Sequence, residues 1–131
     1  MHITGRIATL AATTLTASGL TLAAPALAAD PPIAPYAQAA AQVNANGTIE
    51  NSKNVTDVTK VSTGKYCVRL HPDINAARAI PSATLRTTAD WRSEIYANVD
   101  SSTCSAHPNS IYVYTGKNGA AADEPFFLLV P

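Results

Sequence analysis

Two histidines are the first residues in this chain that could support metal or acid–base chemistry. His71 and His107 are each followed directly by proline, and Asp73 lies two residues after His71. Imidazole and carboxylate groups are common zinc ligands, so these residues could bind a metal if their loops meet. Two histidines at unrelated positions define no ligand set, and exposed loop histidines are more common. We therefore predict neither a metal nor another cofactor.

The serines and carboxylates of the chain form no recognisable catalytic motif. A nucleophilic serine often lies in a Gly-x-Ser-x-Gly turn between a strand and a helix, and this pattern is absent from the sequence. Asp123 and Glu124 are adjacent and cannot flank a glycosidic bond as opposed groups, so we expect them in a solvated loop. A catalytic site also needs a positioned acid, base and oxyanion group. We predict that the protein is not an enzyme, with a small hydrolase as an alternative.

Three tyrosines are the candidate ligand contacts. Tyr112 and Tyr114 alternate with two aliphatic residues, so a strand would place both rings on the face opposite those residues. Tyr96 belongs to another segment with alternating residue types. Tyrosine offers a large contact area at low entropic cost, which suits carbohydrate stacking or protein contact. The alternative is that these rings cover a second hydrophobic layer.

Cys67 and Cys104 are the only cysteines in the chain. In an exported domain of about 100 residues two cysteines usually form a disulfide, and closing this loop would stabilise the fold by about 4 kcal/mol. A catalytic thiol would leave the second cysteine without a partner, and a zinc site would need a Cys-x-x-Cys pair. We predict a structural Cys67–Cys104 bridge.

The N-terminal 28 residues have the three features of a secretory signal peptide. Arg6 precedes an uncharged stretch rich in Ala, Leu and Thr, and Ala26 and Ala28 occupy the −3 and −1 positions of a cleavage site. We predict a cleaved signal peptide over 1–28, a Pro-rich leader over 29–35, and a secreted, extracellular product without membrane contact. The alternative is an uncleaved membrane anchor, because the uncharged stretch is long enough to span a bilayer.

The charge balance excludes one class of partner. Nine basic residues oppose nine acidic ones, and charged residues make up only 14% of the 131-residue chain. A nucleic-acid-binding domain would show a basic face, so we expect no nucleic-acid partner. Much of the 47% hydrophobic content lies in the first 29 residues, so the domain that follows is more polar than the whole chain.

The chain after residue 35 has the residue patterns of short strands. Asn46-Gly47 predicts a hairpin turn after a strand over 36–45, for which an Ala-rich helix is the alternative. Further strands are expected where apolar or β-branched residues alternate with polar ones. These segments are 55–61, 65–70, 82–88, 91–99, 111–114 and 126–130, with a single helical turn at 75–78.

The alternation also predicts which residues face the core. Tyr66, Val68 and Leu70 should share one face, and Trp91 should share another with Ile95. The wholly apolar segment 126–130 is typical of a strand buried on both faces or at a sheet centre. About seven short strands predict an all-β fold, a small antiparallel sandwich or barrel with one disulfide, as a single domain over 36–131.

Three short segments resemble a known group of proteins. They are 43–48 (VNANGT), 54–59 (NVTDVT) and 63–68 (TGKYCV). Their succession is similar to a recurrent pattern in small secreted β-rich proteins of actinobacteria, which are mostly unassigned in function. The resemblance covers residues 36–70. It implies a β-rich exported module and supplies no catalytic residues.

Together these features predict a secreted small β-sandwich that acts as a binding or structural surface module. Its partner would be an extracellular protein or a carbohydrate. The alternative is an inhibitor of an extracellular protease that presents one loop to the enzyme. Segment 102–108, which contains Cys104, would suit that role better than segment 116–125, which we expect to be long and flexible.

Overall fold

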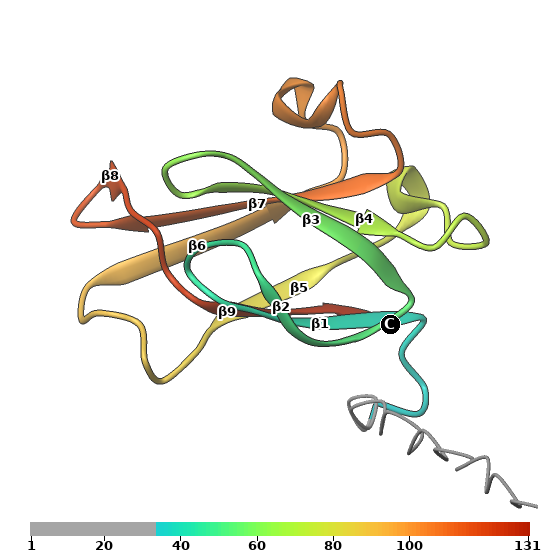
Figure 1. The fold of residues 1–131 in the computed structure, drawn as a ribbon, viewed down its shortest axis with the longest axis horizontal. Helices are drawn as coiled ribbons and strands as arrows, with labels where there is room; N and C mark the ends of the chain where they lie inside the picture. Colours follow the sequence, from blue (N-terminus) through green and yellow to red (C-terminus); the bar gives the residue numbers. More distant parts are fainter. Residues whose placement is uncertain (1–33) are drawn as a thin grey trace, which may run out of the picture.

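The computed structural model describes residues 34–131, so the predicted signal peptide and most of the Pro-rich leader lie outside the described residues. Within this range the chain is all-β, and its strands form two antiparallel sheets (Figure 1). The predicted fold class is confirmed. No helix among residues 34–131 is long and apolar enough to cross a membrane.

The first sheet joins the two ends of the described chain. Its spatial order is β2 (Ile49–Lys53), β1 (Ala39–Val43), β9 (Phe126–Val130) and β5 (Ser82–Leu85). β1 and β9 are antiparallel neighbours at its centre, with Ala41 opposite Leu128. The segment 36–45 therefore forms a strand and not the alternative helix. Its pairing with β9 brings the two ends of the described chain side by side.

The second sheet contains the strands that carry the candidate tyrosines. Its order is β3 (Val55–Ser62), β4 (Lys65–Leu70), β7 (Ser110–Lys117) and β6 (Ser93–Asn98), with β8 (Ala120–Ala121) paired to β7. Two short 3₁₀ helices, η1 (Ala76–Arg78) and η2 (Ser102–Cys104), lie in the connecting loops. The nine strands exceed the predicted seven partly because β8 lies in a segment that we expected to be a loop.

Glycine allows the tight turn between β3 and β4. Gly64 has a φ of +67°, and a Cβ atom there would lie 2.2 Å from the Thr115 carbonyl oxygen. The Gly64 carbonyl in turn accepts a hydrogen bond from the Thr115 N–H at 2.8 Å. A larger residue would need both a disfavoured backbone conformation and a shift of β7. The turn between β3 and β4 therefore makes a close backbone contact with β7.

The core lies between the sheets and uses alternate residues of the central strands. Tyr66, Val68 and Leu70 are buried on one face of β4, as predicted. The Tyr66 ring contacts the Phe126 ring edge to face, with centroids 5.1 Å apart, and this contact joins the two sheets. The other fully buried large side chains include Val43, Ile111, Val113, Leu128 and Val130.

β9 lies at the centre of the first sheet, as its apolar sequence predicts, but it is buried on one face only. Phe127 is 45% exposed and Leu129 is 40% exposed on the outer face of that sheet. Part of the Phe127 ring is covered by the Arg86 guanidinium, which lies 5.7 Å from the ring centroid. Of the two expectations for this segment, the position at the sheet centre is confirmed, and burial on both faces is not found.

The predicted strand over 91–99 begins later than expected, and Trp91 does not share a face with Ile95. Arg92 has a φ of +66°, a left-handed conformation that interrupts the alternation just before β6. Trp91 consequently lies in the loop between β5 and β6, where it is 93% exposed. The predicted strand over 82–88 also ends early, because the chain turns at Arg86, whose carbonyl accepts from Ala89 N–H.

The predicted disulfide is confirmed. Cys67, on the outer face of β4, is bonded to Cys104 in η2, with a Cα–Cα distance of 5.7 Å. The bond spans 37 residues and holds the loop over 99–109 against the outer face of the second sheet. A disulfide of this kind indicates an oxidising environment.

Removing the disulfide should lower the free energy of unfolding by about 4 kcal/mol, because the unfolded chain regains the freedom that the bridge restricts. The change is a Cys67→Ala, Cys104→Ala double variant, measured by urea denaturation against the unreduced protein. Ser105→Ala, an exposed neighbour in the same loop, serves as the control. Equal stability of the double variant, or two free thiols in the intact protein, would contradict the structural role.

Candidate functional site

The loops that carry the two histidines meet at Asn109. Its side-chain oxygen accepts a hydrogen bond from the Ala76 N–H at 2.9 Å, and its nitrogen donates to the Ile74 carbonyl at 2.9 Å. The same nitrogen also donates to the Leu70 carbonyl at 3.3 Å. Asn109 has a φ of +58°, which asparagine tolerates better than most residues. This one amide therefore links the loop after β4 to the disulfide loop.

Although these loops meet, they do not bring the histidines into a common site. The His71 Nδ1 atom lies 3.3 Å from Asp73 Oδ2. His107 instead lines a surface hollow of about 330 Å³ with residues of the disulfide loop, and His71 is not part of its lining. Among residues 34–131, no three His, Cys, Asp or Glu side chains form a group that could hold a metal ion.

The three candidate tyrosines lie together on the outer face of the second sheet. Tyr96 of β6 and Tyr114 of β7 are directly opposite each other, with ring centroids 5.9 Å apart and planes inclined by 36°. Tyr112 lies two residues earlier on the same face of β7. Tyr96 is 61% exposed, whereas Tyr112 and Tyr114 are half-buried. We call Tyr96, Tyr112 and Tyr114 the tyrosine strip.

The disulfide loop covers one end of this strip. Burial raises the pKa of the Tyr112 hydroxyl, the nearby Tyr114 raises it further, and a hydrogen bond with Thr103 opposes the shift. Thr103 belongs to η2, which the disulfide holds against β4. The strip is therefore shielded at Tyr112 and open at Tyr96. The alternative that the tyrosines cover a second hydrophobic layer therefore fits Tyr112 and does not fit the exposed Tyr96.

Polar side chains surround the open end of the strip. Lys65 of β4 is the cross-strand partner of Tyr114. Glu94 lies two residues before Tyr96 in β6 and therefore on the same face of the sheet, whereas Asn98 on that face is opposite Tyr112 at the covered end. An aromatic surface with hydrogen-bonding groups at its edge matches a sugar ring, which has an apolar C–H face and a polar rim.

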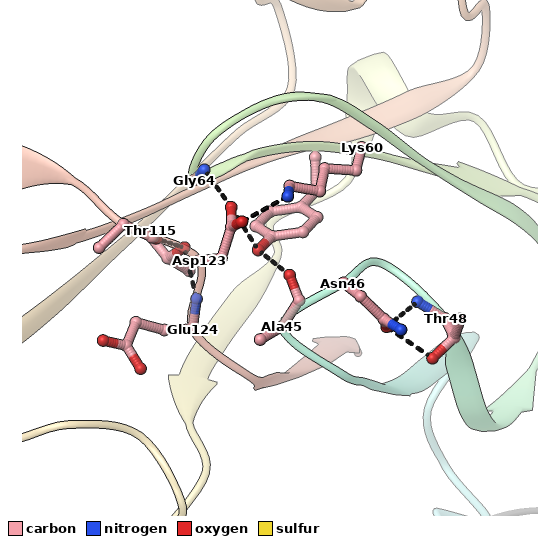
Figure 2. Close-up of polar contacts among 10 residues, drawn as sticks. Ala45, Asn46, Thr48, Lys60, Gly64, Thr115, Asp123 and Glu124 are labelled. Carbon is pink, nitrogen blue, oxygen red and sulfur yellow. Dashed lines mark hydrogen bonds and ion pairs between the residues drawn. The ribbon is translucent and has the colours of Figure 1, made fainter.

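Asp123 is only partly exposed and is held by hydrogen bonds, so the prediction of a solvated loop residue is wrong for it. Its Oδ1 atom accepts a hydrogen bond from the Gly64 N–H at 2.7 Å, and its other oxygen forms an ion pair with Lys60 (Figure 2). The Tyr66 hydroxyl lies 3.4 Å from Asp123 Oδ1 and donates to the Ala45 carbonyl at 2.7 Å. One carboxylate thus connects the segment before β9 to the β3–β4 turn.

Glu124 is buried as well, with only 5% of its surface exposed. Its two oxygens accept hydrogen bonds from the Ser93 hydroxyl at 2.8 Å and the Asp90 N–H at 3.1 Å. Its own N–H donates to the Thr115 hydroxyl at 3.3 Å. Together with the pairing of β8 to β7, these contacts fix the segment 116–125. The predicted flexibility of that segment is wrong.

The electrostatics of Asp123 follow from these contacts. Partial burial by itself would raise the pKa of its carboxyl, but hydrogen bonds from Lys60 and the Gly64 N–H, together with the Lys60 charge, outweigh it. The pKa of Asp123 therefore lies below its ordinary value, and folding is favoured by the ionised form. The arrangement is that of a structural clamp between strands.

Asp123→Asn should lower the free energy of unfolding by about 1 kcal/mol at neutral pH, since the carboxylate is about one-third exposed and partly screened. A lowered folded-state pKa gives stability that is present above the unfolded pKa of 3.8 and is lost as the pH falls through the folded value. The variant should lack this acid-dependent loss in denaturation between pH 6 and pH 2. Asp57→Asn, in an exposed position of β3, should keep it; an unchanged profile for Asp123→Asn would refute the clamp.

Tyr66 should make stability fall in alkaline solution. Burial raises the pKa of its hydroxyl from 10.0 to about 12, and the Asp123 charge adds to the shift. The resulting stability, about 2–3 kcal/mol, is fully present below pH 10 and is lost as the pH rises to about 12. Tyr66→Phe should be less stable at pH 8 and should lose this alkaline slope in urea denaturation. Tyr36→Phe, at a 95% exposed ring, is the control, and an identical slope in both variants would contradict the assignment.

Comparison with known proteins adds no family to these observations. No protein-family model matches the chain, and neither a curated protein nor a solved structure matches it. The resemblance to small secreted proteins of actinobacteria therefore stays a prediction.

Proposed function

We propose that this protein is a secreted binding module that attaches to a carbohydrate surface through the tyrosine strip. The observation that carries the proposal is the cross-strand pair of Tyr96 and Tyr114, with ring centroids 5.9 Å apart on the open part of a sheet face. The sequence features of a signal peptide and the Cys67–Cys104 disulfide support an extracellular location.

The strip suits a sugar because its rings are held in place before a ligand arrives. Tyr96 and Tyr114 stand on paired strands, and the disulfide loop limits movement of Tyr112 at the covered end. Rings that are already ordered lose little conformational entropy on binding. Lys65 and Glu94 lie close enough along the sheet to offer hydrogen bonds to the hydroxyl groups of a stacked sugar.

A binding role is favoured over protease inhibition by the conformation of the disulfide loop. Within segment 102–108, residues Ser102–Cys104 form a 3₁₀ helix, and the His107 N–H donates a hydrogen bond to the Cys104 carbonyl at 2.8 Å. A protease cleft accepts an extended segment that pairs with its own backbone, and this loop does not present one.

Tyr114→Ala and Tyr96→Ala should each weaken retention of the protein on its polysaccharide by about tenfold, because each removes one stacking surface. Retention is measured on columns of insoluble cellulose, chitin and xylan. Thermal unfolding should show that both variants keep their fold, as expected for side chains on an outer face.

Leu129→Ala is the matched control, because Leu129 is a 40% exposed apolar residue on the outer face of the other sheet. It should bind like the unchanged protein. Normal retention of both tyrosine variants would overturn the role of the strip. If no polysaccharide retains the protein, carbohydrate recognition fails as a function, and the strip is better tested against extracellular proteins.

A further inference from the structure

Trp91 is the only tryptophan of the chain, and it projects from the loop between β5 and β6 with 93% of its surface exposed. Single exposed apolar side chains are ordinary on protein surfaces, so exposure alone indicates nothing. The loop that carries Trp91 is less ordinary. It is held from beneath by a buried carboxylate that has no role in the tyrosine strip.

Glu124 contacts the loop on both sides of Trp91. One oxygen accepts from the Asp90 N–H at 3.1 Å, directly before the tryptophan, and the other accepts from the Ser93 hydroxyl at 2.8 Å, two residues after it. Burying a carboxylate is unfavourable unless its hydrogen bonds are satisfied. The buried Glu124 carboxylate is satisfied by hydrogen bonds from this loop, and these bonds fix the backbone on both sides of Trp91.

Two further contacts restrain the same loop. Lys117 forms an ion pair with the Asp90 side chain, and the Asn118 N–H donates to the Arg92 carbonyl at 3.2 Å. Lys117 ends β7 and Asn118 begins the turn to β8, so the loop is tied to the second sheet as well as to Glu124. The backbone that carries Trp91 is therefore held by contacts on both sides of the residue, which lowers the entropy lost when a ligand orders the loop.

A surface hollow of about 430 Å³ lies beside Trp91. Its volume is within the range of small-molecule sites. Its lining combines the apolar side chains of Leu85 and Ala89 with the polar groups of Thr87 and Asp90. An indole face next to apolar groups, with a hydroxyl and a carboxylate at the rim, complements a pyranose ring with its C–H face and hydroxyl edge.

We propose that Trp91 and this hollow form a second sugar-binding site, and that Glu124 is a positioning residue for it. The ligand class rests on the proposed function. Figure 1 shows the β5–β6 loop at the lower edge of the molecule and η2, which covers one end of the tyrosine strip, at the upper edge. None of the three tyrosines lines the hollow, so the two sites use different residues. A domain with both would bind two sugar segments and gain avidity on a polysaccharide.

The emission of Trp91 tests the proposal directly, because no other tryptophan contributes to it. We expect titration of the purified protein with cellohexaose, chitohexaose or xylohexaose to shift this emission to shorter wavelength for at least one sugar. Tyr114→Ala should keep the shift, because the strip is a separate site. Trp91→Ala should weaken binding of that sugar at this site by about tenfold in calorimetry, and Trp91→Phe by less.

Ile80→Ala is the matched control for Trp91, because Ile80 is 84% exposed in another loop and does not line the hollow. Glu124→Gln should weaken the sugar-dependent emission shift and lower the fluorescence anisotropy of Trp91, which shows that the ring has become mobile. If Glu124→Gln does not fold, Ser93→Ala removes one of the two hydrogen bonds and tests the same role.

The outcomes separate this site from the tyrosine strip. Retention that depends on Tyr96 and Tyr114, without any emission shift from the three sugars, would overturn the Trp91 site and leave the proposed function in place. An emission shift, together with unchanged column retention of the Tyr96→Ala and Tyr114→Ala variants, would support the Trp91 site and refute the role of the strip. A shift produced by a protein from the culture medium, but by none of the sugars, would also overturn the proposal.

Discussion

The contact between Tyr66 and Phe126 is the constraint on which the rest of this fold depends. It joins the two sheets with ring centroids 5.1 Å apart, and the Tyr66 hydroxyl also donates to the Ala45 carbonyl in the β1–β2 turn. Because side chains alternate along a strand, an inward Tyr66 requires an outward Cys67. The disulfide, and the loop that it holds, must therefore lie on the outer face of the second sheet. The same register across β7 turns Val113 inward and Tyr114 outward, so the packing of the core decides where the tyrosine strip lies.

Asp123 and Glu124 show how two adjacent carboxylates can organise different parts of one domain. Asp123 points to the β3–β4 turn and Glu124 to the β5–β6 loop, as expected for consecutive residues of an extended segment. Asp123 is paired with a lysine and is partly open to solvent, whereas Glu124 is buried and bonded to neutral donors. The first stabilises the sandwich, and the second holds a loop with an exposed tryptophan. Two adjacent carboxylates thus contribute to the packing of the sandwich and to the support of the Trp91 loop.

Several parts of this structure could be predicted from residue order because their cause is local. The alternation in 65–70 predicted that Tyr66 faces the core, and Asn46-Gly47 predicted the first hairpin turn. The presence of only two cysteines predicted the Cys67–Cys104 bond. Trp91 was misplaced because one left-handed residue, Arg92, breaks the alternation, and the contacts that favour this conformation come from distant residues. The burial of Glu124 had only one signal in the sequence, its position just before the apolar strand 126–130. Its partners lie 31 and 34 residues earlier in the chain.

By itself, then, the sequence determined that the chain forms an all-β fold with one disulfide and that Tyr112 and Tyr114 lie on the strand face opposite Ile111 and Val113. These properties follow from the two-residue period of a strand and from the number of cysteines. Only the tertiary structure decided that Tyr96 meets Tyr114, that the histidines stay apart, and that a buried carboxylate supports the loop of Trp91. Such features depend on strand order and on contacts between distant residues. Many pairings satisfy the same local alternation, and only the packed sheets select one of them.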